Sequence, residues 1–188
     1  THSKQYYSGK HMCTLSHLKP ANLWQLFEKI CSIPHPSKHE QKISLWIQSW
    51  AKELGLSIKE DAIGNLFIKK SATQGMEDCQ GIILQAHMDM VPQKNNDTEH
   101  NFKTDPIRPY IINEIDGDWV TADGTTLGAD NGIGLASALA VLASNDIPHG
   151  PIEVLVTIDE EAGMSGAFGL EAGWLDGDIL INTDSEQE

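Results

Sequence analysis

Three predominantly apolar runs of strand length recur along the chain, and a histidine or a carboxylate follows each of them. The runs cover residues 81–86, 151–158 and 178–182. Strands that are apolar on both faces are typical of a sheet that is covered on both sides. Because helical patterns separate the runs, the sequence predicts an α/β fold with a mixed sheet and helices on both faces. In such sheets ligands bind beyond the carboxyl ends of the strands, where these side chains fall.

The segment before the first run predicts two helices. In the first, apolar side chains recur at three-and-four spacing at Leu23, Trp24, Phe27 and Ile30. It ends at 33–36, Ile-Pro-His-Pro, because each proline holds its predecessor in extended geometry. Ser37 and Glu40 have the spacing of a capping box, which predicts that the second helix begins at Ser37. Gly55 is expected to end it.

Further elements follow in chain order. We expect short strands at 56–60 and 65–69, an edge strand at 118–122, a buried helix at 130–144 and a short helix near 166–172. Residues 92–117 contain three prolines and many polar side chains, which predicts a long loop. A loop of that length inside a domain is often functional.

The charges are unevenly distributed, and this excludes some partners. The net charge is −14, all thirteen Lys and Arg residues lie at or before Arg108, and the following eighty residues carry sixteen Asp and Glu. Such a surface repels nucleic acid. Repulsion between so many acids opposes folding, and bound divalent cations would offset it. A solvated acidic surface is the commoner explanation for such a charge distribution. No apolar run approaches ~18 residues, so we expect no membrane span.

The cysteines and the N-terminal segment favour a cytoplasmic protein. The three cysteines form no CxxC pair, which suggests a reducing compartment. Residues 1–20 are polar and are expected to be loose. The first dozen residues lack the apolar stretch of a signal peptide, and Met12 is a candidate for the true start.

His87 and Asp89 are two positions apart, so on an extended segment both side chains point the same way. One interpretation is that His87 binds a metal while Asp89 orients its ring. The alternative is a histidine at a strand end that is satisfied by a nearby acid. On its own, this common spacing favours the alternative.

Asp130 lies in the glycine-rich segment 124–134, Gly-Thr-Thr-Leu-Gly-Ala-Asp-Asn-Gly-Ile-Gly. The segment does not end in the Gly-Lys-Ser/Thr of a phosphate-binding loop, so that function is rejected. As an acid just before a helix, Asp130 could serve simply as its N-cap. It could instead bridge two cations, with one carboxylate oxygen to each.

Glu160, Glu161 and Asp184 follow the second and third apolar runs. If one of the adjacent glutamates binds a metal, the other can take a proton from water. Adjacent acids are also frequent on solvated loops, and Asp184 could merely begin a turn. Because all these residues occur in order at strand ends, together they favour a two-metal hydrolase site. Zinc suits such ligands, and cobalt or manganese would also fit, whereas the sequence has no EF-hand spacing for calcium.

With these residues in view, the chain resembles the zinc-dependent dipeptidase family of the bacterial cytosolic nonspecific dipeptidases, also called aminoacyl-histidine dipeptidases or peptidase D. The resemblance runs from about Leu23 to the last residue. The stretches that carry it are CSIPHPS at 31–37, LQAHMDMVPQKNND at 84–97, GTTLGADNGIG at 124–134, EEAGMSGA at 160–167 and INTDSE at 181–186.

The resemblance implies four metal ligands in a di-zinc, exopeptidase-like catalytic domain. His87 and Asp184 would hold one zinc ion and Glu161 the other. Asp130 would bridge both ions, and the peptide bond that follows it, to Asn131, would be cis. These ligand roles come from the resemblance and not from the spacing.

The resemblance also implies the reaction. A metal-bound hydroxide would attack the carbonyl of a dipeptide, of the Xaa-His type or of broad specificity. Glu160 would act as the general base and deliver the proton to the leaving amine, and Asp89 would orient His87. In the family, the complete enzyme would be a homodimer.

Members of the family are longer than this chain, with a second domain and a late histidine for the zinc ion that Glu161 holds. Residues 21–188 are therefore expected to be the N-terminal part of the catalytic domain, with a weak site at Glu161 and an unburied edge or face of the sheet. Two alternatives stay open: a truncated product without catalysis, and an N-acyl amino acid deacylase of the same superfamily.

Overall fold

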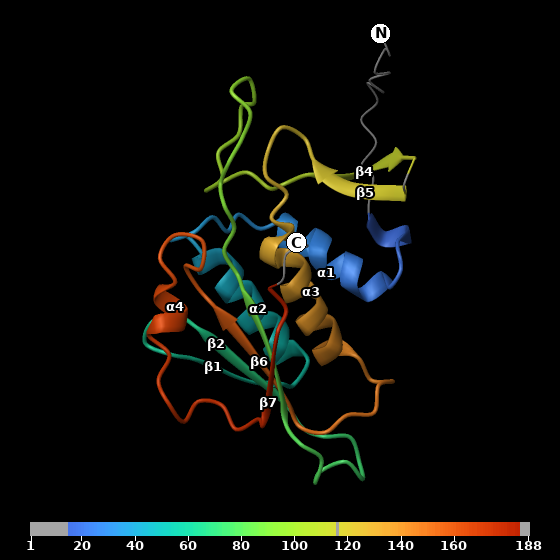
Figure 1. Ribbon diagram of the computed structural model, residues 1–188, viewed down its shortest axis with the longest axis vertical. Coiled ribbons are helices and arrows are strands. Elements are labelled where there is room, and N and C mark those ends of the chain that lie inside the picture. The colour runs from blue at the N-terminus through green and yellow to red at the C-terminus, as the bar shows by residue number, and fades with distance from the viewer. Residues whose placement is uncertain (1–14, 116, 185–188) are drawn as a thin grey trace.

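The fold is given by a computed structural model that describes residues 15–115 and 117–184 (Figure 1). Its helices are η1 (Leu15–His17), α1 (Ala21–Cys31), α2 (Gln41–Glu53), α3 (Ala129–Ala143) and α4 (Ser165–Phe168). Its strands are β1 (Ser57–Glu60), β2 (Leu66–Lys70), β3 (Ile82–His87), β4 (Pro109–Glu114), β5 (Gly117–Ala122), β6 (Ile152–Thr157) and β7 (Ile179–Asn182). Within these ranges, no helix has the length and apolar character needed to cross a membrane.

Five strands form one mixed sheet in the order β1-β2-β6-β3-β7. β1, β2 and β6 pair antiparallel, whereas β6, β3 and β7 run parallel to one another. The predicted mixed α/β sheet is thus confirmed. Because the three parallel strands end at the same edge, the side chains that follow them are brought together there.

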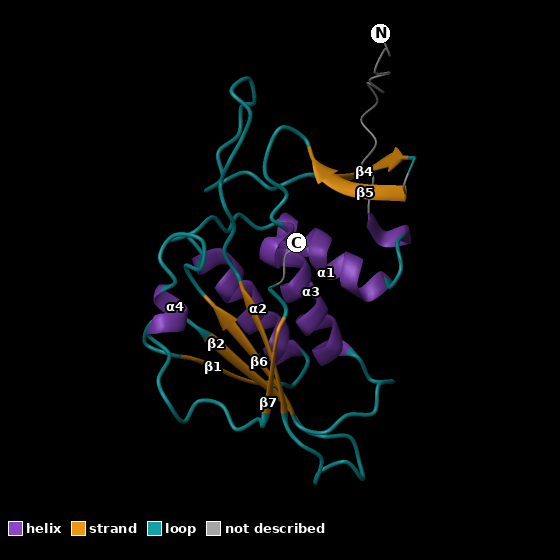
Figure 2. Cartoon of the chain, in the orientation of Figure 1, coloured by secondary structure: helices purple, strands orange, loops and turns teal. Residues whose placement is uncertain are grey.

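The two faces of this sheet are covered differently (Figure 2). On one face, alternate residues of β2, β3 and β6 share a large core with α1, α2 and α3. On the other face, Phe67, Ile83 and Leu155 pack against Leu170 and Trp174, which follow α4. The three long helices therefore lie on one face, and α4 with the segment after it covers part of the other.

The start of α2 differs from the prediction. The helix begins at Gln41, and the predicted capping box is not formed, because both of its side chains bond to distant segments. The Ser37 hydroxyl donates to Asp89 Oδ2 at 2.7 Å, and Glu40 Oε1 accepts from the backbone N–H of Asp159 at 3.1 Å. Gly55 follows the helix with a φ of 71°, so the predicted end is confirmed.

The predicted loop at 92–117 is wrong over its last part. β4 occupies 109–114 and pairs antiparallel with β5 in a separate two-stranded sheet, with Ile111 opposite Val120. The expected strand at 118–122 exists, but its partner is β4 and not the main sheet. Pro109 obscured β4 in the sequence, yet proline is compatible with the first position of a strand.

β7 forms one edge of the main sheet, and its three apolar side chains are solvent-accessible. The exposed fractions of Ile179, Leu180 and Ile181 are 42%, 52% and 45%. The expected unburied edge is thus present. At the other end of the chain, the first fourteen residues of the segment predicted to be loose lie outside the described ranges. Leu15 is fully buried, so the packed core begins before residue 21.

Candidate metal centre

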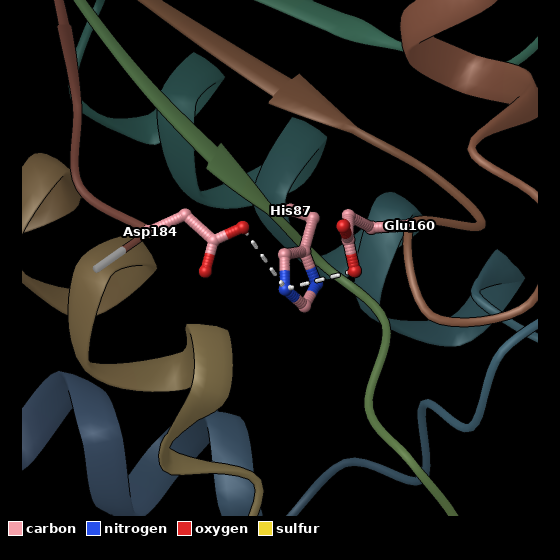
Figure 3. Close-up of side chains that lie close together, drawn as sticks. All are labelled: His87, Glu160 and Asp184. Carbon is pink, nitrogen blue, oxygen red and sulfur yellow. Dashed lines mark ion pairs between the residues drawn. The ribbon is translucent and has the colours of Figure 1, made fainter. Parts of the chain in front are cut away.

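His87 is the last residue of β3 and lies at the centre of the site, with its side chain fully buried. Figure 3 shows its ring between Glu160 and Asp184. Its Nε2 atom lies 3.8 Å from a carboxylate oxygen of each of these residues. The same nitrogen lies 3.1 Å from Asp130 Oδ1. The carboxylates thus converge on one ring nitrogen of a histidine held by the sheet.

Asp130 reaches this nitrogen from the first turn of α3. Gly128 turns the chain into the helix with a φ of 74°, a conformation that suits glycine. Asp130 itself keeps an extended ψ of 111°, and the peptide bond to Asn131 is cis, as the resemblance implied. The carboxylate therefore projects from the helix start towards His87.

Glu160 and Glu161 follow β6 in a turn that Asp89 holds. The backbone N–H of Glu160 donates to Asp89 Oδ1 at 3.0 Å, and that of Glu161 donates to Oδ2 at 3.2 Å. Asp89 Oδ1 also lies 3.2 Å from His87 Nδ1. One buried carboxylate thus connects the histidine with the turn that carries both glutamates.

Asp184 follows β7 and is oriented by α3. The side-chain amide of Asn131 donates to Asp184 Oδ1 and to the carbonyl oxygen of Thr183, both at 3.1 Å. Asn131 is buried, and the sequence interpretation assigned it no role. Only its place directly after Asp130 could have pointed to it.

The predicted ligands therefore lie together. Two groups of three side chains are compact enough to hold a metal ion: His87, Glu160 and Asp184, and His87, Asp130 and Glu161. Both glutamates lie near the histidine. The division of roles between Glu160 as base and Glu161 as ligand stays a prediction.

His87 and Asp89 form a strongly polarised pair. Burial lowers the pKa of His87, but the hydrogen bond and charge of Asp89, with smaller effects of Asp130 and Asp184, raise it to about 9. Burial raises the pKa of Asp89, but hydrogen bonds from His87, Ser37 and the two backbone N–H groups lower it to about 2. Asp89 is therefore a permanent carboxylate that favours a proton on His87 Nδ1.

The other carboxylates are crowded. Burial raises the pKa of Glu160, Glu161 and Asp184, and neighbouring carboxylates, Asp130 among them, raise each pKa further. Positive charge among them would relieve this repulsion. One imidazole nitrogen with several carboxylate oxygens is a donor set that suits zinc and related divalent ions. The residues present therefore fit a divalent metal centre.

Besides Asn131, sequence reasoning missed three residues that support the site: Asp159, Ser37 and Glu40. Asp159 is buried with a φ of 55°, and its carboxylate accepts from the Ser165 hydroxyl at 2.6 Å and pairs with Lys38 at 3.2 Å. Ser37 and Glu40 were identified only as a helix cap. For Asp159, the sequence showed only an acid directly before Glu160. That position does not tell whether the side chain is buried or solvated.

A protein-family model matches more than half of the chain. The model of "Peptidase family M20/M25/M40" matches residues 83–184, which contain every candidate side chain named above as a ligand or base. Among curated proteins, the chain is 62% identical over 177 residues to the cytosol non-specific dipeptidase of Escherichia coli strain K12. This match covers 94% of the chain and 36% of the relative.

Solved structures give the same picture. The crystal structure of an aminoacylhistidine dipeptidase from Vibrio alginolyticus matches with a TM-score of 0.88 and 69% identity, over 93% of this chain and 35% of that one. An aminopeptidase PepT from Bacillus cereus matches with a TM-score of 0.73 and 27% identity, over 94% and 45% of the two chains. The chain thus spans about a third of the length of the two dipeptidases.

Proposed function

The chain belongs to peptidase family M20/M25/M40, and from this membership we propose that it carries the metal centre of a dipeptidase. The resemblance to dipeptidases that the sequence motifs suggested is confirmed by the match to the Escherichia coli protein. The observation that carries the proposal is the convergence of Asp130, Glu160 and Asp184 on His87 Nε2.

Four side chains would hold the metal: His87, Asp130, Glu161 and Asp184. A divalent ion in this position supplies a Lewis acid that polarises a carbonyl group and makes bound water more acidic. Zinc is the proposed ion, two per complete site, and cobalt or manganese would use the same ligands. His87 would not act as the base, because its Nε2 would hold the metal and its Nδ1 lies 3.2 Å from Asp89 Oδ1.

Glu160 would move the proton. Its pKa is raised by burial and by the surrounding carboxylates, which brings it closer to neutral pH than an exposed glutamate. It would take a proton from water and deliver it to the leaving amine of the dipeptide. Asp89 would keep His87 in the Nδ1–H tautomer, so that Nε2 is free to bind the metal.

The proposal for this chain concerns only part of an enzyme, because the chain covers about a third of the length of the two dipeptidases. We propose that residues 21–188 form the N-terminal part of a catalytic domain, and that the segment from Leu15, which is buried in the same core, belongs to it as well. The names of the relatives suggest dipeptides as substrates, the Xaa-His type among them, and the cytosol as the compartment. A homodimer is proposed for the complete enzyme only.

Hydrolysis of an Xaa-His dipeptide by the purified chain, with zinc or cobalt added, tests the function. We expect Glu160→Gln to lower turnover by about 10²–10⁴-fold, because the amide cannot accept the proton. Glu171→Gln is the matched control, because Glu171 is exposed and lies outside the site, and it should leave turnover unchanged. Absence of turnover from folded chain that binds zinc would contradict catalysis and leave a metal-binding, non-catalytic product.

A further inference from the structure

The segment 36–40, here called the 36–40 turn, connects the ends of the two central parallel strands. Pro36 forms a parallel bridge with Met90, three residues after β3 ends. The backbone N–H of Ser37 donates to the carbonyl oxygen of Met90 at 3.2 Å. These backbone contacts hold the turn beside β3.

The Ser37 side chain makes a second, separate contact. Its hydroxyl donates to Asp89 Oδ2 at 2.7 Å. Asp89 is buried, and among residues 15–115 and 117–184 its carboxylate also contacts His87 Nδ1 and the backbone N–H groups of Glu160 and Glu161. A hydrogen bond to a buried, ionised carboxylate is among the stronger kinds. Ser37 is therefore one of four donors that determine how Asp89 is oriented.

The other end of the turn contacts the segment after β6, which carries Glu160 and Glu161. Glu40 Oε1 accepts from the backbone N–H of Lys38 at 2.9 Å and from that of Asp159 at 3.1 Å. Lys38 Nζ lies 3.2 Å from Asp159 Oδ1. The turn thus contacts the chain after β3 through Ser37 and the chain after β6 through Glu40.

We propose that Ser37 is a positioning residue for the metal centre. Its hydroxyl fixes the Asp89 carboxylate, and through Asp89 it orients His87 and the turn of Glu160 and Glu161. The inference rests on the proposed function, because it concerns the same metal site. The inference adds a role for residues 36–40, Pro-Ser-Lys-His-Glu. This segment would contribute to metal affinity, whereas its sequence suggested a helix cap.

Ser37→Ala isolates this role. It removes the hydroxyl, together with its longer 3.4 Å contact to the Met90 carbonyl oxygen, but keeps the 3.2 Å backbone N–H bond to the same oxygen, so the turn stays in place. Asp89 Oδ2 would then keep only the N–H of Glu161, and the carboxylate could rotate away from His87. Residues that orient metal ligands typically contribute about 10–100-fold to metal affinity. We expect Ser37→Ala to weaken zinc binding by about 10-fold.

The experiment measures the zinc dissociation constant by competition with a chromophoric chelator, and the visible absorption spectrum of the cobalt-loaded chain. The variants are Ser37→Ala, Ser37→Thr, which keeps a hydroxyl, and Ser44→Ala as matched control. Ser44 is a buried serine of α2, and its hydroxyl accepts from Gln48 at 3.3 Å, away from the site. Thermal unfolding of the metal-free variants reports any general loss of stability.

We expect weaker zinc binding and an altered cobalt spectrum for Ser37→Ala, near-normal values for Ser37→Thr, and normal values for Ser44→Ala. If Ser37→Ala binds zinc as tightly as the parent chain, or if Ser44→Ala weakens binding equally, the positioning role is overturned while the metal centre stands. If the parent chain binds no zinc, the proposed metal centre itself fails, and the inference fails with it.

Discussion

Asp89 receives donors from three separate segments of the chain, and the charge state of His87 depends on it. The donors are His87 Nδ1, the Ser37 hydroxyl and two backbone N–H groups of the turn after β6. Such a carboxylate stays ionised although it is buried, and it stabilises a proton on the neighbouring imidazole. In the metal-free protein, His87 and Asp89 therefore form an ion pair that contributes to stability.

This ion pair makes the stability of the metal-free protein depend on pH. The pKa of His87 is raised from 6.5 to about 9 on folding, so the folded state binds the proton more tightly than the unfolded state. The resulting stabilisation is complete below pH 6.5 and is lost as the pH rises to about 9. We expect the free energy of unfolding to fall by about 1–3 kcal/mol over this range, measured by urea denaturation in the presence of a chelator.

His87→Asn should flatten that dependence, whereas His39→Asn, which changes an exposed histidine, should preserve it. An equal pH dependence in His87→Asn and the parent chain would show that other groups cause it.

The pattern of acids in the sequence located His87 and its neighbours. It could not reveal the pKa of His87, because that pKa depends on the burial of the ring and on the distance to the Asp89 carboxylate, with smaller effects of Asp130 and Asp184, and all of these are set by the fold.

At the scale of the elements, the close approach of α3 to the end of β7 places Asp184. A Cβ atom at Gly134 would lie 2.9 Å from the carbonyl oxygen of Thr183, and it would also overlap Asn131 Oδ1. Only glycine leaves room for the two segments to meet. The Asn131 amide needs this proximity to reach Asp184.

We therefore expect Gly134→Ala to destabilise the protein and weaken zinc binding. Helix propensity alone would favour alanine by about 1 kcal/mol. The overlap with the Thr183 carbonyl oxygen and with the buried Asn131 side chain outweighs this gain, and overpacking of this kind costs about 1–3 kcal/mol. Urea denaturation and a zinc titration measure the two effects. Ser137→Ala, on the same helix, is the control and should stay within about 0.5 kcal/mol of the parent. A Gly134→Ala variant more stable than the parent would refute the packing argument.

The elements were largely predictable, since eight of the expected helices and strands recur within one or two residues of their predicted bounds: α1, α3, β1, β2, β3, β5, β6 and β7. Apolar periodicity is a local property and carries these predictions. β4 was missed because prolines and polar residues surround it. The capping box at Ser37 and Glu40 was wrong because partners more than fifty residues away displaced the local bonds. Local patterns contain no information about such partners.

At the scale of the whole molecule, several acids from the last eighty residues come together at the carboxyl edge of the sheet. Residues 109–188 carry sixteen acids and no Lys or Arg, and Asp130, Glu160, Glu161 and Asp184 come from this part. Their repulsion opposes folding unless cations are bound. The sheet itself ends in the apolar edge strand β7, which leaves the candidate metal centre close to an open edge.

Metal binding should therefore stabilise the fold. Zinc at 100 times its dissociation constant should raise the free energy of unfolding by about 2.7 kcal/mol, and a chelator should reverse the effect. Asp130→Asn should abolish most of the gain, because it removes the carboxylate nearest to His87 Nε2. Asp146→Asn, at an exposed acid outside the site, should keep it. Thermal unfolding that is identical with and without zinc would argue against linkage between folding and this site.

The most direct test of the metal centre is anomalous diffraction at the zinc edge from crystals of the chain grown with zinc. The structure predicts an anomalous peak within coordination distance of His87 Nε2, with oxygens of Asp130 and of Glu161 or Asp184 around it. Peaks found only at surface side chains, with the space around His87 Nε2 filled by water, would contradict the assignment of this site.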